Sequence, residues 1–251
     1  MPVAAVSTAA DSPEADSAEE ADMHGDVQGL ILSVAIVGFF LGTAFLITRY
    51  GKKRLGAMCP EVARKVVHIG VSNWFFIYAH VFESDIWPIV GLAGFTVINY
   101  VLNVSGGLHT VMGQESRKRN WGLVQYPIAI IILIALKHFG VGDVVCVGCA
   151  VLGMGYGDGL ASVVGMNVKS PKLPGKSRKT VAGSVTMVLV TFLVFIIMNL
   201  VYRQGVAASR LILVGLLTSV CATLVEAYTP FGLDNLSVPI VIFFLSWLVA
   251  A

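Results

Sequence analysis

The sequence is short of charge. Asp, Glu, Lys and Arg make up 13% of its 251 residues, whereas 56% are hydrophobic, and the mean hydropathy is +0.81. Soluble globular domains carry about 25% charged residues. This composition therefore excludes an ordinary soluble domain and predicts a polytopic membrane protein.

Strand-like alternation of polar and apolar residues is also absent. Inside a lipid bilayer, backbone groups are satisfied only in helices or closed barrels, so long apolar runs without alternation predict helices. The sequence thus predicts an all-α bundle of about eight transmembrane helices, or seven if the last run does not cross. The expected spans are 29–48, 66–82, 86–103, 121–139, 143–166, 181–202, 208–228 and 236–251.

Cysteine is scarce and lacks a metal or disulfide pattern. Cys146 and Cys149 form a C-x-x-C pair inside an apolar run, and Cys59 and Cys221 stand far apart in the sequence. These residues are expected to be small buried hydrophobic groups. Nothing in the sequence indicates a nucleic-acid-binding protein.

Lys and Arg are missing from the first 28 residues, which contain seven Asp or Glu and much Ala and Ser. Such a composition is typical of a disordered segment. The sequence therefore predicts two regions, a disordered acidic tail over 1–28 and a transmembrane catalytic domain over 29–251.

Basic residues gather on one side of the expected bundle. Fourteen of the 17 Lys and Arg fall in the loops after the first, third and fifth spans. By the positive-inside rule these loops are expected to be cytoplasmic and the N-terminus outside. Ionisable groups at membrane depth usually mark a site, and several map to this same side: Glu61, His68, Glu115, Asp158, Glu226 and Asp234.

The segment 157–184 combines these features. If it is helical up to residue 166, Asp158 and Ser162 share a face, and the glycines at 153–159 allow either close helix packing or a break that frees amide groups for an anion. A basic loop follows. Cations, backbone amides and a carboxylate that holds Mg²⁺ together suit a polyphosphate. A P-loop is excluded because Ser170 stands where its first glycine is required.

Four segments, in this order, resemble the polyprenol, phytol and dolichol kinase family, which includes CTP-dependent diacylglycerol kinases. They are "RKVVHIG" at 64–70, "GDGLASVVG" at 157–165, "KSRKTVAGS" at 176–184 and "VEAYTPFGLDNLSVPI" at 225–240. The resemblance implies transfer of the γ-phosphate of a nucleotide, CTP, to a long-chain isoprenoid alcohol (phytol, farnesol, polyprenol or dolichol) or diacylglycerol at the cytoplasmic face of the membrane.

The resemblance also implies roles for individual residues. The catalytic set is Asp158, Lys179, His68 and Glu226. Nucleotide or phosphate contacts are expected from Gly157, Ser162, Lys176, Arg178, Thr180, Gly183, Ser184, Arg64 and Lys65. A Mg²⁺ or Mn²⁺ ion is expected at Asp158, Asp234 and Asn235.

The chain departs from the family pattern at two places. Ala182 stands where many phytol and dolichol kinases have Glu, and "GMNVKSPKLPGK" replaces a Gly-x-x-Phe-Gly-Lys element. Both departures leave the identity of the alcohol open. Two other functions also remain open: a CTP-dependent cytidylyltransferase that makes a CDP-lipid, and an anion or lipid transporter.

Overall fold

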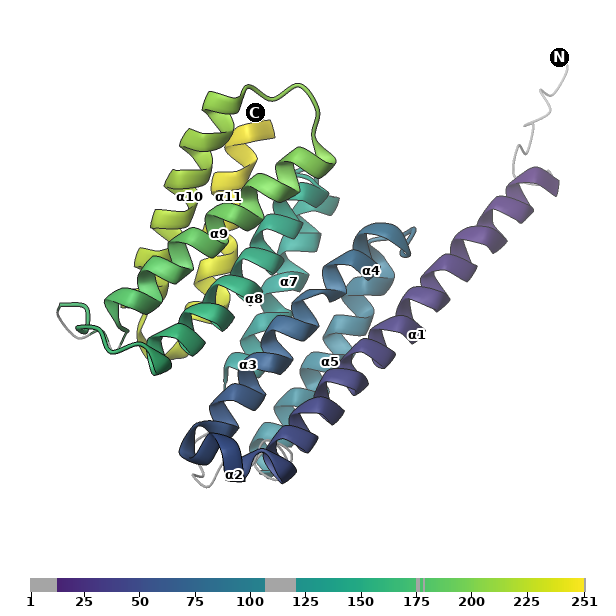
Figure 1. Ribbon diagram of the computed structural model, residues 1–251. Coiled ribbons are helices and arrows are strands. Elements are labelled where there is room, and N and C mark those ends of the chain that lie inside the picture. Colours follow the sequence, from purple (N-terminus) through teal and green to yellow (C-terminus); the bar gives the residue numbers. More distant parts are fainter. Residues whose placement is uncertain (1–12, 107–120, 175–176, 178, 251) are drawn as a thin grey trace, which may run out of the picture.

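The computed structural model describes residues 13–106, 121–174, 177 and 179–250 and is an all-α bundle (Figure 1). Within those ranges there is no strand, and the one isolated bridge pairs Lys172 with Thr180. The predicted fold class is therefore confirmed.

Each predicted span has a helical counterpart. The elements are α1 (Pro13–Tyr50), α2 (Lys52–Leu55), the 3-10 turn η1 (Gly56–Met58), α3 (Cys59–Ser72), α4 (Trp74–His80), α5 (Ile86–Ser105), α7 (Gly122–His138), α8 (Val144–Asn167), α9 (Val181–Tyr202), α10 (Ala208–Tyr228), η2 (Pro230–Gly232) and α11 (Asp234–Ala250). By length and composition, five of them can cross a membrane: α1 from Asp22, α5, α8, α9 and α10. Two more, α7 and α11, are apolar but shorter.

The predicted span 66–82 is divided into α3 and α4 at Asn73. The Asn73 amide donates to the carbonyl oxygens of Ile69 at 3.0 Å and Gly70 at 3.3 Å, and its oxygen accepts from the Tyr156 hydroxyl at 2.9 Å. A side chain that satisfies the last carbonyls of a helix stabilises its end. The division therefore has a local cause and is anchored on α8.

The acidic segment differs from the disordered tail that its composition predicts. Helix α1 already begins at Pro13, so residues 13–28 are helical. Asp26 is 4% exposed and accepts hydrogen bonds from the backbone N–H groups of Glu83 and Ser84, both at 3.1 Å. These bonds fix this part of α1 to the loop after α4. Residues 1–12 lie outside the described part of the chain.

Helix α8 is the most buried of the five long helices and lies inside the bundle, in contact with α3, α7, α9 and α11. Its glycines allow α3 to approach closely: a Cβ on Gly155 would lie 2.3 Å from Cβ of Ser72, and one on Gly159 would lie 2.3 Å from Cγ1 of Ile69. The helix is continuous from Val144 to Asn167. Close packing, and not a break, is therefore the role of these glycines.

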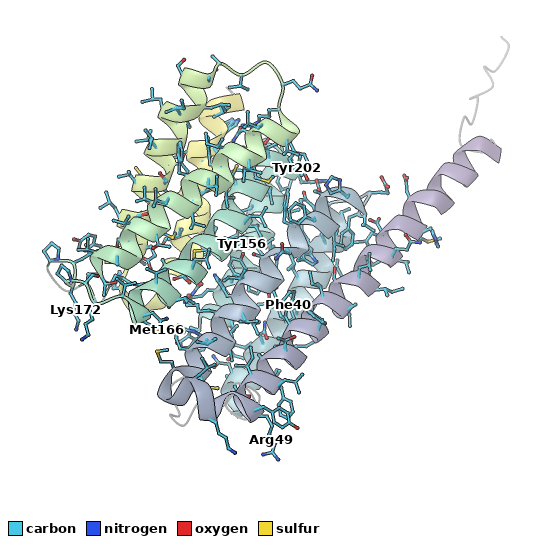
Figure 2. The ribbon with its side chains drawn as sticks, viewed as in Figure 1. Phe40, Arg49, Tyr156, Met166, Lys172 and Tyr202 are labelled. Atoms are coloured by element: carbon cyan, nitrogen blue, oxygen red, sulfur yellow. The ribbon has the colours of Figure 1, made fainter. Side chains whose placement is uncertain are left out.

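The loops after α1 and α8 lie at the same end of the bundle. Figure 2 shows Arg49, Met166 and Lys172 at that end and Tyr202 toward the other. The basic loop after α8 is held by backbone hydrogen bonds from Leu173 to Lys179 and from Val181 to Pro171, each 2.9 Å. We call this the basic end of the bundle.

Arg203 ties three helices together at the opposite end. Its guanidinium donates two hydrogen bonds of 2.7 Å from Nη2 to the carboxylate of Asp143, which caps the N-terminus of α8 by accepting from the N–H of Cys146. It also donates to the side-chain oxygen of Asn199 on α9 and to the carbonyl of Ser246 on α11. A bidentate pair of this kind fixes orientation as well as distance.

Replacing Arg203 with Met is expected to destabilise the bundle by about 2 kcal/mol, because the helix cap at Asp143 loses its charged partner in a partly buried setting. The measurement is thermal unfolding of purified protein in detergent. Arg210→Met is the matched control, since Arg210 is exposed and makes a single bond, to the carbonyl of Leu248. Equal melting temperatures for the two variants would contradict the assigned role.

Candidate active site

The Asp158 carboxylate lies at the centre of a buried charge cluster. Its Oδ2 accepts a hydrogen bond from Lys65 Nζ at 2.5 Å and lies 3.7 Å from Nε2 of His68. Its Oδ1 lies 3.7 Å from Nζ of Lys179. The side chains of Asp158 and Lys65 are each 7% exposed. The predicted carboxylate is therefore inside the protein and is balanced by cations from two other segments.

Local sequence explains why α3 supplies two of these partners. Lys65 and His68 are three residues apart, so they lie on the same face of α3. That face is held against α8 by the contact between Ile69 and Gly159, the residue after Asp158. A larger side chain at 159 would push α3 away and separate Lys65 from Asp158.

Lys179 joins the cluster from the basic loop. Its ammonium forms an ion pair with Glu226 at the end of α10 and lies 3.7 Å from Asp158 and 3.9 Å from Asp234 at the start of α11. Burial alone would lower the pKa of Lys179, but the carboxylates of Asp158, Glu226 and Asp234 outweigh it and raise the pKa above its ordinary value. Lys179 therefore remains charged.

Three carboxylates meet around this lysine. One oxygen each of Asp158, Glu226 and Asp234 lies within 4.8 Å of the others. Hard divalent cations prefer such oxygen ligands. The three carboxylates carry one more charge than the two ammonium groups of Lys65 and Lys179 can balance. If His68 is neutral, the cluster therefore has a net negative charge. The donor set thus fits Mg²⁺ or Mn²⁺, with Glu226 as a third carboxylate besides the predicted Asp158 and Asp234.

The cluster forms one wall of a cavity of about 660 Å³, which we call the charged cavity. Most of the predicted site residues line it: Arg64, Lys65, His68, Asp158, Ser162, Lys179, Asp234 and Asn235. They come from α3, α8, the basic loop and the start of α11. Segments that are distant in the sequence are therefore brought together at one place, toward the basic end.

A smaller cavity of about 150 Å³ adjoins it and shares Ser162 and Lys179. Its other lining residues include the predicted Thr180, Gly183 and Ser184, at the N-terminus of α9. The Ser184 hydroxyl is buried here and makes no hydrogen bond to the described residues. An unpaired buried hydroxyl beside a lysine is suited to an anionic oxygen.

The backbone amides of this helix terminus are already paired. The N–H groups of residues 181–184 donate in turn to Pro171 O, Ser170 Oγ, Thr180 Oγ1 and Thr180 O. Any phosphate contact here therefore depends on side chains, chiefly Lys179 and Ser184.

Three predicted residues are not placed in either cavity. Gly157 faces α9 instead, where an added Cβ would lie 2.7 Å from both Met187 Sδ and Thr191 Oγ1. Its position indicates helix packing. Lys176 and Arg178 lie outside the described residues.

Sequence analysis assigned no role to two further residues of the charged cavity. Glu61 accepts from Arg64 Nη2 at 2.5 Å and from Ser162 Oγ at 3.4 Å, so it links α3 to α8. Tyr126 packs against the His68 ring, with ring centroids 4.8 Å apart, and donates to Val151 O. The three-residue spacing of Glu61 and Arg64 could have predicted their ion pair on one face of a helix. No pattern in the sequence around Tyr126 indicated that it lines the cavity.

Known proteins resemble the chain over most of its length. The phytol kinase of Synechocystis sp. is 31% identical over 223 residues, which cover 87% of this chain and 91% of that protein. A probable chloroplastic phytol kinase 2 of Oryza sativa subsp. japonica is 27% identical, covering 89% of this chain and 78% of that protein. No protein-family model and no solved structure matches the chain.

These relatives agree with the resemblance carried by the four motifs, and the residues of those motifs meet around Asp158. The chain belongs to the phytol kinase family of membrane proteins, phosphotransferases that act on an alcohol group.

Proposed function

We propose that this protein transfers the γ-phosphate of CTP to a long-chain isoprenoid alcohol of the phytol, farnesol, polyprenol or dolichol type, at the cytoplasmic face of a membrane. The observation that carries the proposal is the meeting of Lys65, Lys179 and the three carboxylates in one cluster, from which Glu226 lines the smaller cavity and the other two carboxylates line the charged cavity. Phosphoryl transfer depends mainly on positioning and charge stabilisation, which such a cluster provides. The kinase names of the relatives support the reaction class.

In the proposed reaction, the alcohol oxygen forms a bond to the γ-phosphorus while the bond from that phosphorus to the β–γ bridging oxygen breaks. The hydroxyl proton leaves, and a nucleoside diphosphate is released. Arg64, Lys65 and Lys179 line the charged cavity and would offset phosphate charge. His68 presents a buried Nε2 that makes no hydrogen bond to the described residues, and it would accept the hydroxyl proton.

The carboxylates of Asp158, Glu226 and Asp234, with Asn235 beside them, would hold Mg²⁺ or Mn²⁺, and the ion would supply positive charge to offset that of the nucleotide phosphates. Ser184, together with Lys179, would contact a phosphate oxygen in the smaller cavity.

The reaction class is tested with purified protein in lipid, given CTP or ATP labelled at either the α or the γ phosphate, and phytol, farnesol, a polyprenol or diacylglycerol. We expect label from the γ position in the lipid, Mg²⁺ dependence and a preference for CTP. Transfer of the α label with release of pyrophosphate would identify a cytidylyltransferase instead. Absence of transfer from either position, with the protein intact, would contradict both enzymes and favour a transporter.

Asp158→Asn is expected to lower turnover roughly a thousandfold or more, about 4 kcal/mol, because Asn keeps the shape but loses the charge that a divalent cation requires. Specific activity is measured on monodisperse protein while Mg²⁺ is titrated. Asp85→Asn is the matched control. It removes a carboxylate paired with Lys137 and Tyr78 outside the charged cavity, so it should cost stability and retain activity.

A loss at Asp158→Asn below about tenfold at saturating Mg²⁺, or roughly 1.4 kcal/mol, would remove this residue from the reaction centre. Glu226 and Asp234 would then be the remaining carboxylates. If Asp158→Asn and Asp85→Asn lost the same specific activity, the loss would be due to impaired folding and not to a role in the reaction.

The basic loops support the proposed cytoplasmic location of the site. In a background without the four native cysteines, K172C should react with a membrane-impermeant maleimide only after permeabilisation, whereas M23C should react in intact cells. Both positions are exposed, and Lys172 lies at the basic end (Figure 2). Labelling of K172C from outside would reverse the proposed orientation and place the charged cavity on the other face.

A further inference from the structure

A second large cavity, of about 460 Å³, runs between α1 and α5, which lie beside each other in Figure 1. We call it the α1–α5 groove. Its walls are hydrocarbon, and its polar atoms are already paired: Trp74 Nε1 donates to Ser33 Oγ, Ser33 Oγ donates to Gly29 O, and Tyr126 OH donates to Val151 O. The groove therefore offers no hydrogen bond to a polar ligand and suits an apolar one.

The groove is continuous with the charged cavity. Val71, Phe95, Tyr126 and Pro127 line both spaces. At this junction the Tyr126 ring also packs against His68. A single molecule with a polar end and a long apolar end can therefore reach both spaces at once.

We infer that the α1–α5 groove binds the hydrocarbon tail of the lipid alcohol, with the hydroxyl placed at the Tyr126 end beside His68. This inference rests on the proposed function and adds to it the site that binds the tail and distinguishes its length. Along α1 the groove extends from Leu30 to Leu41, a length of about 16 Å at 1.5 Å per residue. The tail would thus lie along the two helices, away from the charged cavity.

The groove is open to the surroundings of the bundle. Val34 on α1 and Val90 and Ile98 on α5 line it, yet they are 75%, 51% and 57% exposed. A tail dissolved in the bilayer can therefore enter from the side between α1 and α5. The alcohol then reaches the cluster without leaving the lipid.

Two glycines keep the groove wide. Gly38 on α1 and Gly94 on α5 line it from opposite walls, and a Cβ at either position would meet no heavy atom within 4 Å. A large side chain there would occupy the space of the tail without clashing with the protein. Gly42, one turn further along α1, is equally unobstructed and does not line the groove.

The test uses the full chain with Gly38→Phe, Gly94→Phe and the control Gly42→Phe, each assayed with phytol and with the shorter geraniol. A phenyl ring in the groove would occupy space that the phytol tail needs, and such overpacking should lower kcat/KM for phytol at least about tenfold in the two groove variants. Geraniol should lose less activity than phytol, because fewer of its carbons extend beyond Gly38 and Gly94. The Gly42 variant should match the wild type with both alcohols.

Suppose that the wild type phosphorylates phytol, but the groove variants affect both alcohols equally or neither of them. The groove would then not be the tail-binding site, and the proposed function would stand. A wild type that phosphorylates neither alcohol would contradict the function, and binding then tests the groove separately.

A phytol analogue with a diazirine near its tail end should crosslink to residues 30–41 and 88–98, and Gly38→Phe, unlike Gly42→Phe, should reduce this crosslinking. Crosslinks spread over the exposed faces of α9 and α10 would indicate surrounding lipid only and overturn the inference.

Discussion

The ion pair between Lys65 and Asp158 is the contact on which the active site depends. Both side chains are almost fully buried, and removal of charged groups from water costs several kcal/mol for each ion. Each group is tolerated only while its partner stays in place. Helices α3 and α8 are therefore held at one separation, and His68, on the same face of α3, takes its position in the charged cavity from this pair.

The packing of α8 prepares this contact. Gly155 and Gly159 leave room for Ser72 and Ile69, so α3 lies close against α8 over the two turns that follow Lys65. Tyr126 then closes the space on the far side of His68 and also lines the apolar groove. Tyr126 thus lies at the junction between the part of the protein that carries charge and the part that carries hydrocarbon.

Hydropathy alone predicted the helices because each crossing needs a long apolar run, and the scarcity of charge made Asp158, Lys179 and Glu226 conspicuous. The division at Asn73 lies inside an apolar run, where hydropathy gives no sign of it, and the Tyr156 hydroxyl that holds the Asn73 side chain is remote in the sequence. Composition also gave no sign that Asp26, at the end of the acidic segment, finds backbone partners in another loop. The α1–α5 groove has the same Leu, Val and Phe composition as any surface that faces lipid, so only the arrangement of helices distinguishes it.

Lys179 differs from the other members of the charge cluster in its freedom to move. Its side chain is 36% exposed and sits on a loop, whereas Asp158 and Glu226 are buried on helices. Rotation of an exposed side chain takes picoseconds to nanoseconds, far less time than a shift of packed helices. A rotamer change alone would therefore withdraw the Lys179 ammonium from the buried carboxylates, without a shift of the packed helices.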